Sequence, residues 1–246
     1  MPASNPTKTR AVHTARAFTG RLMALQDDEE LRKIQRYFKS AEGEYGHGDR
    51  FIGVRMGSIF ALAKEFADMP LKDIETLLDS DIHESRVGAL SIMAKQYALE
   101  TTSDERRKEL YQLYLRRHDR INNWDLVDLA AWHVVGPWLV DKPRAVLHKL
   151  AKSKDMWERR TAILATFNFI RRGEFDDTLR IAQLLIKDKE DLSHKAAGWM
   201  LRSVGDKDRE VLNAFLEEHA PGMPRAMLSN AIEKFTPAEK THYRAL

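Results

Sequence analysis

Two side chains four residues apart in the segment INNWDLVDLAAWHVVGPW (residues 121–138) could act together on a positively charged group. In a helix, Trp124 and Asp128 would share one face, one turn apart. An indole face attracts cations, and a carboxylate stabilises positive charge. Trp199 in HKAAGWMLR could add a second indole to the same place. The structural alternative is that Trp124 is a core aromatic and Asp128 the ion-pair partner of a nearby arginine.

The remaining tryptophans have simpler assignments. Trp132 and Trp138 are predicted to belong to the core, and the same assignment is favoured for Trp157.

The sequence lacks the residues that several other kinds of catalysis require. The chain has no cysteine, and none of its nine histidines forms an HExxH pair, so a catalytic zinc site is not indicated. The glycine-rich segment SAEGEYGHGDRF (residues 40–51) is predicted to be a loop. It lacks the Gly-Lys-Ser/Thr ending and the preceding strand of a phosphate-binding loop. The sequence therefore implies neither a metal nor an organic cofactor.

The elements that must position these residues are helices. Apolar residues recur at intervals of three and four, as in Ile59, Leu62, Ala63 and Phe66, while alternating β-branched patterns are nearly absent. We therefore predict an all-α protein. The 246 residues suffice for one large domain, which we place at residues 11–246 after a disordered segment at 1–10.

One type of helix recurs along the chain. It starts with a basic residue and turns apolar, as in ESRVGALSIM, WERRTAILAT, SHKAAGWMLR and PRAMLSNAI. The anchors are Arg86, Arg160, Lys195 and Arg225, with Asp125 at the equivalent place in NWDLVDLAAW; their spacings of 39, 35, 35 and 30 residues are typical of helix-pair repeats. Stacked pairs of this kind form a solenoid, which we expect to be right-handed, HEAT-like and lined by a concave basic groove.

The uneven distribution of charge suggests a partner for such a groove. The net charge is only +3, but residues 141–160 carry seven Lys or Arg against three Asp or Glu. Basic residues gathered on one face would attract a phosphate backbone. The alternative for a charged segment of this kind is a set of solvated helix faces.

Four segments carry a resemblance that covers most of the chain, from about Leu31 to the C-terminus. YFKSAEGEYGHGDRFIGVR, INNWDLVDLAAWHVVG, MWERRTAILATFNFIRRGEFDDTL and HKAAGWMLRSVG resemble the DNA alkylation repair (AlkD-like) family of HEAT-like repeat glycosylases. The resemblance implies that Trp124, Asp128 and Trp199 surround a damaged nucleotide. It also implies DNA contacts by Arg160 and its neighbour Arg159, and by Tyr37, beside the contacts expected of Arg86, Lys195 and Arg225.

The activity implied is monofunctional hydrolysis of the N-glycosidic bond of 3- and 7-alkylpurines in duplex DNA, in a shallow groove without a deep base pocket. A cationic purine is a good leaving group, and a carboxylate can stabilise the developing oxocarbenium ion. The first alternative is a non-catalytic binder of branched or distorted DNA, and the second is a protein-binding helical scaffold. We further expect a cytoplasmic monomer that reaches the nucleoid through DNA.

Overall fold

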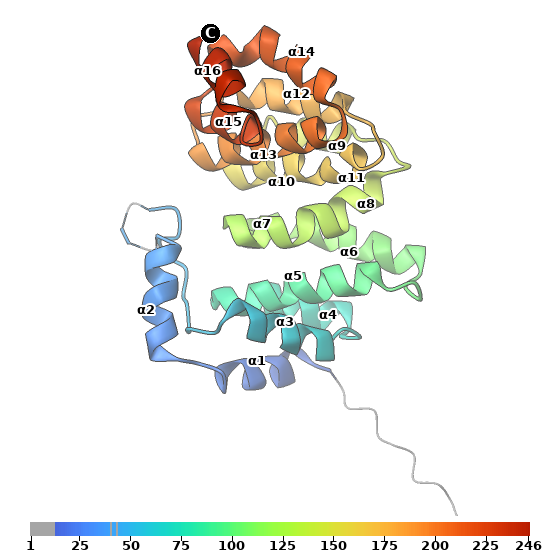
Figure 1. Cartoon of the computed structure of the whole chain (residues 1–246). Coiled ribbons are helices and arrows are strands. Elements are labelled where there is room, and N and C mark those ends of the chain that lie inside the picture. Colours follow the sequence, from blue (N-terminus) through green and yellow to red (C-terminus); the bar gives the residue numbers. More distant parts are fainter. Residues whose placement is uncertain (1–12, 40, 43) are drawn as a thin grey trace, which may run out of the picture. The chain divides into compact units, whose positions relative to one another are not determined.

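The structure of this protein is a computed structural model that describes residues 13–39, 41–42 and 44–246 (Figure 1). Within these residues most helices are connected by short turns, the long connection between Tyr37 and Met56 being the exception, and extended pairing is limited to one isolated bridge between Arg50 and Ile82. The all-α prediction is confirmed. None of the described helices is both long and apolar enough to cross a membrane.

The chain forms two compact units, one ending at Lys95 and the other running from Gln96 to Leu246. The single domain expected over residues 11–246 stays a prediction, and residues 1–10 lie outside the described part of the chain.

The first unit contains five helices within its described residues. Their bounds are α1 (Ala15–Met23), α2 (Asp28–Tyr37), α3 (Met56–Glu65), α4 (Leu71–Leu78) and α5 (His83–Ala98), the last of which extends three residues past the boundary. The predicted glycine-rich loop follows α2. Its residues 41–42 and 44–51 contain turns and bends but no helix.

A buried carboxylate holds the segment that follows this loop. Glu84 is 2% exposed and accepts hydrogen bonds from the backbone N–H groups of Ile52, Gly53 and Val54 at 2.9–3.3 Å. Gly53 has φ +79°, and a Cβ there would lie 2.2 Å from the Asp27 carbonyl oxygen. The sequence thus needs glycine at this position to let the segment pass against the start of α2.

The second unit is built from two rows of helices. The first row consists of α7 (Trp124–Ala130), a π-helical turn η2 (Ala131–Val135), α8 (Gly136–Leu139), α10 (Met156–Ala165), α11 (Phe167–Ile170), α13 (Asp191–Lys207) and α15 (Arg225–Ala231). The second row consists of α6 (Asp104–Arg116), α9 (Ala145–Leu150), α12 (Asp176–Leu185) and α14 (Arg209–His219). The short helices η1 (His118–Arg120) and η3 (Ala220–Gly222) and the terminal α16 (Pro237–Ala245) complete the unit.

Successive members of the first row pack on one another. In Figure 1, α10 lies between α7 and α13, and it contacts both; α13 in turn packs on α15. Two of these helices also contact second-row neighbours, α10 with α9 and α13 with α12. This stacking of helix pairs is consistent with an α-solenoid, while its handedness and a concave basic groove stay predictions.

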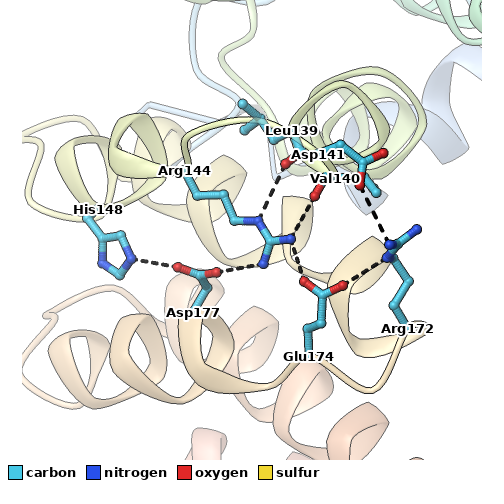
Figure 2. A network of polar contacts seen from close by, with 8 residues as sticks. All are labelled: Leu139, Val140, Asp141, Arg144, His148, Arg172, Glu174 and Asp177. Carbon is cyan, nitrogen blue, oxygen red and sulfur yellow. Dashed lines mark hydrogen bonds and ion pairs between the residues drawn. The ribbon is translucent and has the colours of Figure 1, made fainter.

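Ion pairs join neighbouring repeats of the second unit. In Figure 2, Arg144, just before α9, donates hydrogen bonds to the Leu139 and Val140 carbonyls behind it and to Asp177 and Glu174, about thirty residues ahead. Its guanidinium carbon lies 3.7 Å from the centroid of the Phe169 ring.

The same network extends to both sides of Arg144 (Figure 2). His148 contacts Asp177 at 2.8 Å, and Arg172 donates to Glu174 at 2.8 Å. Hydrogen bonds from Arg172 and Arg144 lower the pKa of Glu174. A basic residue near the start of a repeat can therefore tie together two repeats and the turn between them.

Candidate active site

The two turns of α7 carry Trp124 and Asp128. The buried Asn123 precedes the helix, and its side-chain oxygen accepts from the Trp124 N–H at 2.8 Å. Trp124 and Asp128 follow on one helical face, and both are half-buried. The predicted pairing of an indole and a carboxylate on one face of a helix is therefore present.

A bidentate ion pair fixes the orientation of the Asp128 carboxylate. Arg160 of α10 donates from Nε to Oδ1 at 2.8 Å and from Nη2 to Oδ2 at 2.9 Å. Its remaining Nη1 donates to the Leu192 carbonyl, in the first turn of α13, at 2.6 Å. One guanidinium thus joins three first-row helices, and such fork-shaped pairing is the most directional form of ion pair available to proteins.

Burial and pairing act in opposite directions on this carboxyl group. Burial raises the pKa of Asp128 above its ordinary value, Arg160 opposes that rise, and nearby Asp125 adds to it. The Asp128 side chain keeps 19% of its surface exposed, whereas the Arg160 side chain keeps 7%. Arg160 uses one acceptor position on each oxygen, which leaves the other lone pairs of the carboxylate available to a ligand or a water.

A layer of uncharged polar groups lies close to the pair. The Thr161 hydroxyl contacts the Tyr114 hydroxyl at 2.8 Å and His118 Nε2 at 2.9 Å, and all three residues are buried. Burial raises the pKa of Tyr114 and lowers the pKa of His118, so both side chains are favoured in their neutral forms. This layer supplies no competing charge beside Asp128.

The second indole, Trp199, lies in the middle of α13 and is half-buried. Its ring meets that of Trp132 edge to face, with centroids 4.9 Å apart. Trp199 follows Leu192, whose carbonyl accepts from Arg160, by seven residues or two helical turns, so the side chains of Trp199 and Leu192 share one face of α13. Neither Trp124 nor Trp199 is a fully buried core residue.

The core assignment of two other tryptophans is wrong. Trp132 and Trp138 are both half-buried and line a cavity of the second unit, whereas Trp157 is 8% exposed and belongs to the core as predicted. Sequence reasoning missed Trp132 although it follows Asp128 by four residues and could have been placed on the Trp124–Asp128 face.

The residues predicted to contact DNA fall into two groups. Some bind carboxylates or carbonyls of this chain, and the others are exposed. Arg86 is only 3% exposed, because its guanidinium donates to Asp49 at 2.5 Å and to the Ser80 carbonyl at 3.0 Å. This burial contradicts the expectation that the Arg86 side chain lies open to DNA. An arginine at the start of a repeat helix can turn back to its own loop and neighbour, and the spacing of the anchors could not exclude that.

Arg159 and Arg160 are engaged in the same way. Arg159 holds Asp188 with two hydrogen bonds at 2.7 and 2.9 Å, and Arg160 holds Asp128. Lys195 and Arg225 are exposed, and Tyr37 at the end of α2 is 67% exposed. Phosphate contacts by these last three residues stay predictions.

Four further lysines lie in the two connections that lead from α9 to α10 and from α12 to α13. Lys152, Lys154, Lys187 and Lys189 line a cavity of about 610 Å³, and all four are exposed.

Within residues 13–39, 41–42 and 44–246, no three His, Asp or Glu side chains are arranged so that they could hold a metal ion.

These observations define an all-α protein of stacked helix pairs whose candidate site is a half-buried carboxylate held by an arginine, with an indole on the same helical face. Residues 19–235 match the DNA alkylation repair enzyme family, and the chain belongs to that family. A solved structure with a similar fold is described as a predicted DNA alkylation repair enzyme from Enterococcus faecalis. The two share 16% identity with a TM-score of 0.67, over 86% of this chain and 97% of that one. No curated protein matches the chain.

Proposed function

We propose that this protein is a DNA glycosylase that hydrolyses the N-glycosidic bond of cationic 3- and 7-alkylpurines in duplex DNA. The observation that carries the proposal is the half-buried Asp128 carboxylate, which Arg160 holds in one orientation on the helical face that also bears Trp124. Membership of the DNA alkylation repair family supports a role on alkylated DNA.

The reaction needs little acid catalysis, because an alkylated purine already carries the positive charge of a good leaving group. As the glycosidic bond breaks, positive charge moves to the sugar. A fixed carboxylate stabilises that charge without reorganising, and its free lone pairs can orient the attacking water. The indole faces of Trp124 and Trp199 would attract the cationic base before the bond breaks.

Arg160 has two effects in this scheme. It keeps Asp128 ionised against the rise in pKa that burial causes, and it fixes the carboxylate in space. It also removes part of the negative potential that the cation would meet. Arg160 is therefore proposed as a positioning residue rather than as a phosphate contact.

Phosphate contacts are better assigned to exposed cations. Arg225 begins α15 and Lys195 lies in the second turn of α13, and the exposed loop lysines Lys152, Lys154, Lys187 and Lys189 add positive charge to the second unit. Their ammonium and guanidinium groups can neutralise backbone phosphates without breaking a buried pair.

The experiment is single-turnover release of 7-methylguanine from methylated duplex DNA. Asp128→Asn keeps the shape of the side chain but removes its charge, so we expect the rate to fall about a hundred- to a thousandfold while DNA affinity holds. Asp191→Asn is the matched control, since that carboxylate also lies in the second unit but is 79% exposed. Unchanged release by Asp128→Asn would refute the proposed mechanism.

The Asp128–Arg160 pair also favours a second candidate function. A carboxylate neutralised by an arginine is what a non-catalytic binder of branched or distorted DNA would be expected to carry, because a free negative charge would repel its ligand. The same experiment separates the two functions: the binder releases no base from methylated DNA, yet prefers distorted over paired duplex.

A further inference from the structure

A cavity of about 660 Å³ opens in the second unit beside the candidate active site. It lies where η2 and α8 meet the end of α11, and residues of α5 and α6 close its remaining side. Its volume falls within the range of small-ligand sites. Neither Asp128 nor Trp199 lines it, so it is a separate site that shares only a neighbouring wall with the first.

That shared wall is Trp132. Its indole contacts Trp199 edge to face on the side of the candidate active site and Phe167 at 5.2 Å between centroids. Trp132 follows Asp128 by four residues in the sequence.

Local backbone structure fixes this wall. Residues Ala131–Val135 form a π-helical turn, a feature that often occurs at functional sites. The Asn168 side-chain amide donates to the Trp132 carbonyl at 2.7 Å, and a Cβ on Gly136 would lie 2.3 Å from the Ala165 carbonyl oxygen. The glycine and the amide together hold α8 close against the α10–α11 pair.

The cavity combines flat aromatic faces with cations. Tyr97, Trp132, Trp138 and Phe167 supply the rings. The Trp138 ring stacks on Tyr111 at 5.8 Å between centroids, so its orientation is fixed.

Three cations accompany these rings, namely Arg107, Lys142 and Arg171, and two exposed acids, Asp104 and Asp141, also line the cavity. Lys142 Nζ lies 3.8 Å from the centroid of Trp138, and Arg107 is fixed by the carbonyls of Tyr97 and Leu99. Arg171 is exposed.

These features select the chemistry of the ligand. The two acids pair with cations, Asp104 with Arg107 at 3.3 Å and Asp141 with Arg172 at 3.6 Å, so Lys142 and Arg171 would still repel a cationic ligand. A purely apolar ligand would leave that charge unused. A planar ring that carries a phosphate satisfies both parts, because rings stack on indoles and phosphates bind guanidinium and ammonium groups.

We propose that this cavity binds one unpaired nucleotide of a DNA strand, with the base against Trp132 and Trp138 and its phosphate at Arg171 and Lys142. This proposal takes DNA as the binding partner from the proposed function, but it does not depend on hydrolysis of the glycosidic bond. It also departs from the shallow groove without a deep base pocket that the family resemblance implied. A free mononucleotide has the same ring and phosphate, so the experiment must distinguish it from a nucleotide within a DNA strand.

The test is the affinity for a duplex with a single-nucleotide bulge of 2-aminopurine, relative to the same duplex fully paired. The wild-type protein should prefer the bulge by roughly 5- to 150-fold, the range for one stacked base, and should quench the 2-aminopurine fluorescence. Trp138→Ala and Arg171→Gln should reduce the preference and leave the affinity for paired duplex within about threefold. Arg171 is exposed, so its replacement keeps the test informative if Trp138→Ala fails to fold.

Lys187→Gln is the matched control, because Lys187 is an exposed cation of the second unit outside this cavity. It should weaken both duplexes alike and leave the preference unchanged. Equal wild-type affinity for bulged and paired duplex, or unchanged preference in both cavity variants, would overturn the proposal. Binding of free dAMP without any preference for the bulge would overturn the assignment to a DNA strand.

Base release from methylated, fully paired duplex separates this inference from the proposed function. A bulge preference that depends on Trp138 and Arg171, without any base release, supports the cavity and refutes the glycosylase. Base release without a bulge preference supports the glycosylase and refutes nucleotide binding in the cavity.

Discussion

Removing Arg160 should leave Asp128 as a half-buried carboxylate without its partner. Arg160→Met keeps much of the length and the apolar stem of the side chain but removes all three hydrogen-bonding nitrogens. Breaking a buried ion pair on one side costs about 3–5 kcal/mol. Because the Asp128 side chain keeps 19% exposure, water can solvate it in part, and we expect about 2–4 kcal/mol at neutral pH.

The destabilisation should depend on pH with a definite sign. Burial already raises the pKa of Asp128, and Arg160 opposes the rise, so the variant should have a still higher folded-state pKa. A carboxyl whose pKa is raised on folding keeps a proton that the unfolded chain releases. Stability is therefore lost as pH rises from the ordinary pKa to the folded one, by up to about 1.4 kcal/mol per pH unit. The variant should be closest to wild type near pH 4.5 and furthest from it at neutral pH.

The assay is urea unfolding followed by tryptophan fluorescence between pH 4.5 and 8. All five tryptophans of the chain follow Gln96, so this signal reports on the second unit alone. Arg180→Met is the control, because Arg180 is an exposed arginine of α12.

A double variant isolates the cause. Combining Arg160→Met with Asp128→Asn removes the stranded charge, so the excess pH dependence should disappear and part of the lost stability should return. A destabilisation by Arg160→Met that is equal at every pH, or that Asp128→Asn fails to relieve, would refute the argument that Arg160 serves to hold Asp128 ionised.

Three further predictions follow from the same contacts. Lys195→Ala should reduce the slope of log DNA affinity against log salt concentration by about 1, because it removes one phosphate contact; an unchanged slope would exclude Lys195 from the interface. Arg86→Met should lower the midpoint of unfolding of the first unit, followed by hydrogen exchange, and leave that slope unchanged, since Arg86 is committed to Asp49. Trp199→Ala should slow 7-methylguanine release at least tenfold while changing duplex affinity less than threefold; equal losses in both measurements would make Trp199 a general binding residue.

The sequence predicted the all-α fold correctly, because the spacing of apolar residues along the chain both forms the repeat pattern and determines where helices form. It also predicted Trp124 and Asp128 on one face, since a separation of four residues leaves little freedom within a helix. The alternative that Asp128 is an arginine's ion-pair partner proved correct for that residue, while Trp124 is not a fully buried core residue.

The fate of the basic anchors could not be read from their spacing. Arg86 and Arg160 stand at repeat positions and Arg159 stands beside one, yet each guanidinium turns to an acid tens of residues away in sequence. The acids are ordinary surface residue types, and only packing reveals which of them lies within reach. An arginine also binds carbonyls at the end of the preceding turn, a partner that no side-chain pattern records.

This use of arginine changes how the charge of the chain should be understood. An arginine engaged by a neighbouring repeat stabilises the stacking of helices and contributes little to the field that DNA would meet, because its charge is already neutralised. The exposed lysines carry no such constraint, and their solvated ammonium groups can exchange water for phosphate at small cost. Replacing Lys152 and Lys154 together by Gln should therefore weaken duplex binding more than any single buried arginine does, without lowering the unfolding midpoint of the second unit. If the double lysine variant binds duplex as tightly as wild type at low salt, the loop lysines are solvated bystanders and the phosphate contacts must lie elsewhere.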